Sequence, residues 1–294
     1  RDDRGDGESD KYIILIDRVN KDFNVVRKNG LMVSCEKFCK DKALEIEKIN
    51  ISDISKDLKS PKESVRRKVE ELEKKGVIKK NKKRIYINMN AFSPERVNQG
   101  IKEVSTFLYE FNKLLKKENE INQTFDVEQI IRSIKENYSF CWYQFYKFLF
   151  IYTNRWRNSV GDLETYCIGM VVMLNAVERE SFRVKDLNMK QFQNSLPYIK
   201  ERGVNAMSIS EITGIPRPTV VRKLKYLVDN GYLSIDEKKL LEVNIRGEAL
   251  KISKILQDKN ILSLRNCTYR VFNQIKIINS NKYKDYYFIP SYIR

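Results

Sequence analysis

The sequence predicts a mainly helical protein with small β-hairpins, an α+β class in which helices dominate. A chain of 294 residues is long enough for about two domains, each with its own core. In several segments apolar residues recur at spacings of three and four, as they do on one face of a helix. A segment of 25 residues also occurs twice, and strand-like runs around a polar turn follow each time.

The repeated segment comprises residues 54–78 and 209–233, here called copy one and copy two. They align without a gap at a constant offset of 155. Agreement at positions of such different chemistry indicates two copies of one structural unit. The matched pairs are Ile54 and Ile209, Ser55 and Ser210, Pro61 and Pro216, Ser64 and Thr219, Val65 and Val220, Arg67 and Arg222, Lys68 and Lys223, Val69 and Leu224, Leu72 and Leu227, and Gly76 and Gly231.

The residue pattern of each copy predicts two helices followed by a β-hairpin. The first helix is short and ends before Pro61 or Pro216, because the residue that precedes proline avoids the helical conformation. The second helix is amphipathic, and Gly76 or Gly231 is expected in the left-handed conformation just after its end. Its apolar stripe comprises Val65, Val69 and Leu72, or Val220, Leu224 and Leu227. The hairpin strands are expected at 77–79 and 84–88 in copy one, and at 232–235 and 240–244 in copy two.

Helix, proline-marked turn, amphipathic helix and hairpin make a winged helix-turn-helix. Copy two, ISEITGIPRPTVVRKLKYLVDNGYL, resembles the DNA-binding part of MarR- and IclR-type bacterial transcription regulators. Copy one is a looser match, since Lys59 stands where copy two has Gly214. The resemblance covers two stretches of about 40 residues each. It implies two winged helix-turn-helix units joined by long helices, and sequence-specific binding of double-stranded DNA by a transcription regulator.

The second helix of each copy is the predicted reader of DNA. An α-helix fits the major groove, where arginine and lysine bind guanine edges and hydroxyl groups bind phosphate or base. The resemblance implies that residues near the start of this helix read the bases. The expected DNA-binding residues are Lys62, Ser64, Arg66, Arg67, Lys68, Lys82, Lys83 and Arg84 in copy one, and Arg217, Thr219, Arg222, Lys223, Lys225 and Lys238 in copy two.

The net charge of the chain is +17, from 56 basic and 39 acidic residues, and such an excess attracts polyanions. Residues 59–84 of copy one carry a net charge of +8, whereas the matching residues 214–239 of copy two carry +3. We therefore expect copy one to bind phosphates more tightly and copy two to contribute more sequence discrimination. The alternative is that the basic turn of copy one is only a solvated hairpin.

Further helices are expected between the copies. Ser93, Pro94 and Glu95 are typical of a helix start, and the periodicity extends this helix to about Lys117. Residues 138–156 are densely aromatic and predict a buried helix, with a dimer interface as the alternative. Asp162 is a candidate cap for a helix over 163–177. The expected organisation is an acidic disordered lead-in (1–10), the first winged-helix unit (11–92), a helical connection (93–160), the second winged-helix unit (161–246), and a C-terminal helix with a docking tail (247–294).

Enzymatic chemistry is not expected. The chain has no histidine, which excludes histidine-based triads and zinc sites, and it has no Gly-rich phosphate loop. The five cysteines are scattered and are expected to be buried free thiols, so neither a metal nor a cofactor is predicted. Isolated carboxylates such as Asp17 and Glu164 are expected to be surface groups or helix caps.

The expected partner is double-stranded DNA, in the cytoplasm and associated with the nucleoid. No apolar stretch is long enough to span a membrane. The apolar run at 286–293 is expected to dock, on this chain or on a partner. Two other functions stay open: a plasmid- or phage-type replication initiator that binds origin repeats, and a winged-helix scaffold that binds proteins. A homodimer formed through the flanking helices and an unidentified small-molecule effector also stay open.

Overall fold

A computed structural model describes residues 8–40, 43–45, 51–81, 84–88, 93–118, 124–177, 204–235, 241–244 and 248–280. The protein is mainly helical, as predicted. The described residues group into two compact units. The copy-one unit comprises the described residues within Asp10–Tyr152 and Ile261–Arg294, and the copy-two unit comprises those within Arg1–Ser9 and Thr153–Asn260. Among the described residues, none of the helices combines the length and the apolar character needed to cross a lipid bilayer.

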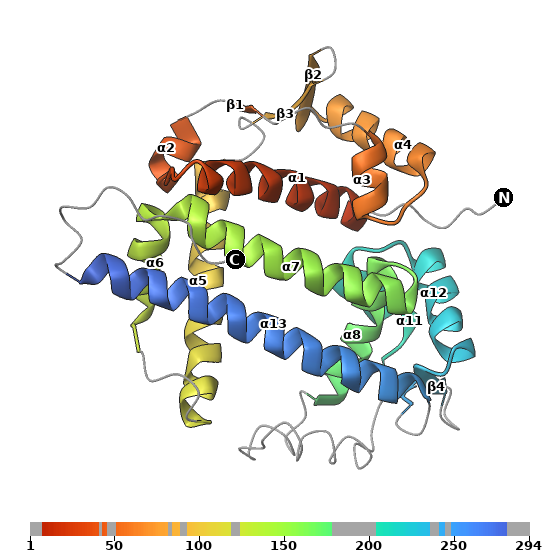
Figure 1. Ribbon diagram of the computed structural model, residues 1–294. Helices are drawn as coiled ribbons and strands as arrows, with labels where there is room; N and C mark the ends of the chain where they lie inside the picture. Colours follow the sequence, from red (N-terminus) through yellow and green to blue (C-terminus); the bar gives the residue numbers. More distant parts are fainter. Residues whose placement is uncertain are drawn as a thin grey trace. The chain divides into compact units, whose positions relative to one another are not determined.

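Figure 1 labels the helices and the strands β1 to β4. The helices are α1 (Glu8–Lys28), α2 (Cys35–Lys40), α3 (Ile51–Asp57), α4 (Lys62–Lys74), α5 (Pro94–Lys117), α6 (Val127–Glu136), α7 (Tyr138–Val160), α8 (Leu163–Val177), α11 (Ala206–Thr213), α12 (Arg217–Asp229) and α13 (Glu248–Asn279). The strands are β1 (Ala43–Glu45), β2 (Ile78–Asn81), β3 (Arg84–Asn88), β4 (Leu233–Ile235) and β5 (Leu241–Val243).

The helix starts follow local capping signals. The Ser93 hydroxyl accepts a hydrogen bond from the Arg96 backbone N–H at 3.2 Å, and Pro94 occupies the first position of α5. α5 ends at Lys117, as predicted. The predicted helix over 163–177 is α8, and its predicted cap, Asp162, accepts from the Thr165 N–H at 2.7 Å. α1 begins at Glu8, inside the stretch expected to be a disordered lead-in.

In the copy-one unit, α3, α4 and the hairpin β2–β3 surround an apolar core. Its buried side chains are Ile54, Leu58, Val65, Val69, Leu72 and Ile78. The sheet has the order β1-β3-β2, and all its pairs are antiparallel. β1 was not predicted from the sequence. Two ion pairs join α1 to this group, from Lys11 to Glu71 on α4 and from Lys21 to Asp57 on α3.

In the copy-two unit, α8 packs against α11, α12 and β5. The core joins Ile168 and Val172 of α8 to Ile209, Val220, Leu224, Leu227 and Leu233 of copy two. β4 and β5 form an antiparallel hairpin, and Val204 makes an isolated antiparallel bridge to Leu241 of β5. The elements α11, α12, β4 and β5 therefore follow the same order as α3, α4, β2 and β3.

The aromatic part of α7 lies mostly in the core of the copy-one unit. Tyr138, Trp142, Tyr143 and Phe148 are buried, and the ring of Tyr138 stacks on that of Trp142 with centroids 5.1 Å apart. The core interpretation of this stretch is confirmed for these residues.

The cysteines are free, as predicted, but not all are buried. Cys35, Cys141 and Cys267 are buried, whereas Cys167 is exposed. Burial, with a smaller effect of neighbouring Cys39, raises the pKa of Cys35 to about 11. Within the described part of the chain, no group of cysteine and carboxylate side chains is placed to hold a metal ion. The expected docking run at 286–293 lies outside the described residues.

Candidate nucleic-acid interface

The turn between the two helices is closed in the same way in both copies. In copy one the Ser55 hydroxyl donates to the Ser60 carbonyl oxygen at 2.6 Å. In copy two the Ser210 hydroxyl donates to the Ile215 carbonyl oxygen at 2.7 Å. Both donors and both acceptors are related by the offset of 155 found in the sequence. The bond fixes the angle at which the chain enters α4 or α12.

The second helix also ends in the same way. Gly76 and Gly231 have φ values of 70° and 72°, as expected for left-handed residues after a helix. The Val77 N–H then donates to the Leu72 carbonyl at 3.0 Å, and the Tyr232 N–H donates to the Leu227 carbonyl at 2.9 Å. The two hairpins therefore leave their helices from matching points.

The turns differ at one backbone position. Gly214 has a φ of 69°, and its counterpart Lys59 has a φ of 48°. Lys59 is the one non-glycine residue with positive φ among the described residues. Glycine adopts this region without a steric penalty, whereas a side chain with a Cβ is strained there. Copy one therefore keeps the backbone of the repeat at a cost in free energy.

Two of the expected DNA-binding residues face the core instead. Lys68 and Lys223 are each 4% exposed, although both were predicted to contact DNA. Lys68 follows Val65 by three residues and precedes Leu72 by four, which places it on the buried stripe of α4. Lys223 occupies the equivalent position on α12. Both lysines are therefore removed from the candidate interface.

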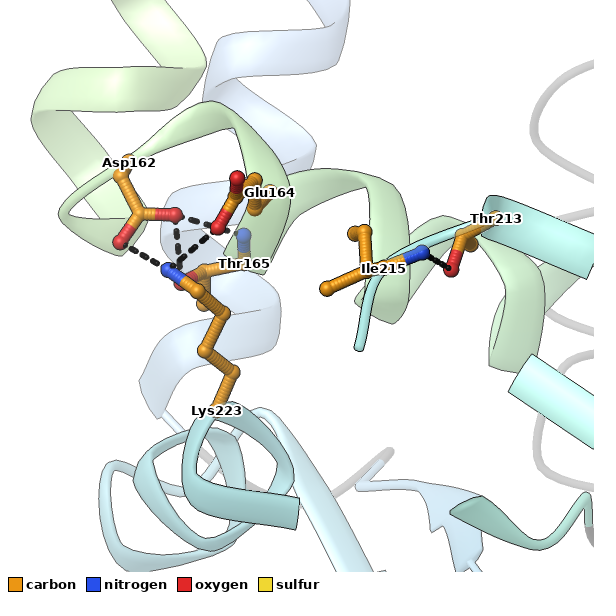
Figure 2. Close-up of polar contacts among 6 residues, drawn as sticks. All are labelled: Asp162, Glu164, Thr165, Thr213, Ile215 and Lys223. Carbon is orange, nitrogen blue, oxygen red and sulfur yellow. Dashed lines mark hydrogen bonds and ion pairs between the residues drawn. The ribbon is translucent and has the colours of Figure 1, made fainter. Parts of the chain in front are cut away.

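Lys223 joins α12 to the start of α8 (Figure 2). Its Nζ lies 2.6 Å from Asp162 Oδ2, 3.3 Å from Thr165 Oγ1 and 3.4 Å from Glu164 Oε2. Three acceptors match the three donors of an ammonium group. Asp162 uses its other oxygen, Oδ1, to accept from the Thr165 N–H and hydroxyl. This role of Lys223 was not predicted, because its partners lie on α8, about 60 residues earlier in the chain.

The carboxylates expected at the surface are also partnered or buried. Glu164 forms the ion pair with Lys223, and its side chain is only 14% exposed. Asp17 is buried in the copy-one unit and lies 3.2 Å from the Nζ of Lys21. Burial raises the pKa of Asp17, and the charge of Lys21 opposes this. The expectation of a surface group or a helix cap is therefore wrong for Asp17, whereas Glu164 is half-buried in the first turn of α8.

The opposite face of each second helix is exposed and carries the remaining cations. The exposed residues of α4 are Lys62, Glu63, Arg66, Arg67, Glu70 and Lys74. Those of α12 are Arg217, Pro218, Val221, Arg222, Lys225, Tyr226 and Asp229. The expected hydroxyl residues, Ser64 and Thr219, are half-buried in the first turns. Six of the expected DNA-binding residues thus lie on two outward faces, with Arg67 and Arg222 at equivalent positions.

The outward face of α4 also carries acidic groups. Glu63 forms an ion pair with Arg66, with 3.1 Å between Oε1 and Nη1, and Glu70 lies one turn further along. At the matching positions α12 has Pro218 and Lys225. A phosphate that approaches α4 meets these carboxylates, whereas on α12 the acidic residue is Asp229 at the end of the helix.

The charge difference between the copies lies in the hairpins. Residues 59–74 carry six basic and four acidic residues, and residues 214–229 carry four and one. Residues 75–84 carry six basic residues and no acidic one, whereas residues 230–239 carry two of each. Lys79 on β2 is exposed, and Arg84 begins β3. Lys82, Lys83 and Lys238 lie outside the described residues.

No family model matches this chain, and no match was found among curated proteins or solved structures.

Proposed function

We propose that the protein binds double-stranded DNA sequence-specifically and acts as a transcription regulator, with two winged helix-turn-helix units per chain. One observation carries the proposal. In both copies, an exposed face with arginine and lysine lies opposite the buried valine and leucine stripe of the second helix, after a turn closed by the same hydrogen bond.

The strands support the winged-helix assignment. In copy one, β1 precedes α3 in the chain and pairs with β3 of the hairpin. In copy two, Val204 precedes α11 and bridges to Leu241 of β5. In each copy, therefore, chain that precedes the first helix adds a pairing to the second hairpin strand. This shared pairing is a further feature of one repeated unit, beyond the aligned helices.

The helix starts support phosphate binding. Pro61 and Pro216 precede α4 and α12, and neither makes a side-chain capping hydrogen bond. The N–H groups of a first helical turn have no partner within the helix, and the helix dipole favours an anion there. At α4, Lys62 stands at the first position, although Glu63 beside it is acidic. At α12, Pro218 has no N–H and the Thr219 N–H donates to the Pro216 carbonyl oxygen at 2.9 Å, so Arg217 offers a phosphate its own N–H together with its guanidinium.

The test uses the full chain and genomic fragments recovered by their binding to it. The variant carries Arg66→Ala, Arg67→Ala and Arg222→Ala, and the control carries Lys102→Ala, Lys116→Ala and Lys117→Ala, which removes the same charge from exposed positions on α5. A bidentate base contact contributes about 1–3 kcal/mol of discrimination. We therefore expect the arginine variant to lose tenfold or more in affinity and to lose preference for the recovered fragment over random DNA, measured by fluorescence anisotropy.

Equal binding by the arginine variant and the lysine control would contradict the assignment of these outward faces. Affinity of the unchanged protein should fall steeply with added salt, since phosphate neutralisation releases counterions. The positions of the recovered fragments separate a regulator from a replication initiator, because promoters support the first and clustered origin repeats support the second.

A further inference from the structure

Val221 is an apolar side chain among the cations of α12. It is 51% exposed and lies one turn from both Arg217 and Lys225, next to Arg222. The preceding residue, Val220, belongs to the core together with Leu224 and Leu227. Val221 is therefore on the outward face that the proposed function assigns to DNA, and it contributes nothing to that core.

A lone exposed valine is common on protein surfaces, so exposure alone carries no function. The position of Val221 is more informative. A β-branched residue is a weaker helix former than the lysine or arginine that would suit an exposed site. At the equivalent position α4 has Arg66, which is exposed and paired with Glu63. Copy two thus places a methyl-bearing surface where copy one places a guanidinium.

The major groove of DNA offers an apolar group that such a surface can contact, the C5-methyl group of thymine. Arginine beside it can bind the O6 and N7 atoms of guanine. We propose that Val221 is a specificity-determining residue that packs against a thymine methyl group, next to a guanine bound by Arg222. The inference rests on the proposed function and deepens it: copy two selects a thymine that copy one does not select, so the two half-sites differ.

The experiment removes the methyl group from the DNA and the valine from the protein separately. A duplex is selected from a random library with the full chain, and each thymidine is replaced in turn by deoxyuridine, which lacks only the methyl group. Burying one methyl group stabilises by about 0.8 kcal/mol, which corresponds to about fourfold in affinity. We expect one or two uracil positions to weaken binding about fourfold, and Val221→Ala to bind the thymine and uracil duplexes equally.

The matched control is Ile212→Ala, which removes an apolar side chain that is 67% exposed on α11. It should keep the full uracil penalty. An unchanged penalty in Val221→Ala, or no sensitive thymine at all, would overturn the thymine assignment while DNA binding stands. If the unchanged protein selects no duplex over the random pool, the proposed function fails and this inference fails with it.

Discussion

Copy one and copy two have matching backbone conformations but differ in how their charged residues are distributed. Both have the serine-closed turn, the left-handed glycine and the same buried stripe. Copy one has most of its net positive charge in the hairpin, because acidic groups offset the basic ones on the outward face of α4, whereas copy two has its net positive charge in the segment of α12. Under the proposed function, the difference would separate attraction to phosphates from recognition of bases, because the charge of the hairpin and the residues of the helix face differ independently between the copies.

The largest expected effect comes from removing the positive charges of the copy-one hairpin. Replacing the basic residues of 79–84 with alanine should lower DNA affinity on the order of a thousandfold at low salt, because each lost phosphate contact reduces the slope of log affinity against log salt by about 0.9. The slope is measured by anisotropy over a salt series. In the reverse direction, replacing both Asp236 and Glu237 with lysine should raise the DNA affinity and steepen its dependence on salt. Slopes that stay the same in both variants would mean that the hairpins do not contact phosphates.

The next effect concerns stability. It tests whether the loss of an ion pair in the copy-two unit leaves the stability of copy one unchanged. Lys223→Met leaves Asp162 and Glu164 without their cation, and breaking a buried ion pair from one side costs about 3 kcal/mol. Hydrogen exchange should therefore become faster in peptides from α8 and α12 and stay unchanged in peptides from α4. Adding Asp162→Asn and Glu164→Gln should recover part of the loss. A variant with no change in α12 would show that the ion pair contributes no stability.

The smallest effect lies at the turn, where the copies differ in backbone strain. Lys59→Gly should stabilise copy one by about 1 kcal/mol, because glycine adopts positive φ without a penalty. Gly214→Lys should destabilise copy two by a similar amount, since a Cβ built at Gly214 meets no atom within 4 Å and only the backbone cost remains. Hydrogen-exchange rates of peptides from α3 and α11 measure the two changes in stability. Changes of the same sign in the two variants would contradict equivalence of the turns.

Elements with strong local signals were predicted closely. The bounds of α5 and α8 follow from Ser93, Pro94 and Asp162 together with the apolar periodicity, and both predictions are confirmed. β1 was missed because a run of three residues is too short to show an alternation of apolar and polar side chains. Its partner strand, β3, lies 41 to 45 residues further along the chain.

The burial of Lys68 and Lys223 was missed for a different reason. Both lie at helical spacing within the apolar stripe, which was a readable signal, but a lysine is buried only where a partner compensates its charge. For Lys223 the partners come from the start of α8, some 60 residues earlier in the chain. Sequence periodicity identifies the face of a helix, and only the tertiary structure identifies what lies against it.

Asp162 performs two tasks with one carboxylate, since Oδ1 begins α8 and Oδ2 holds the lysine of α12. Asparagine, serine and threonine are good caps but are uncharged, and glutamate is charged but is not among the preferred caps. Aspartate alone meets both requirements. Relatives that keep a lysine at 223 should therefore tolerate almost no exchange at 162, while relatives that have lost that lysine should drift freely among the small capping residues.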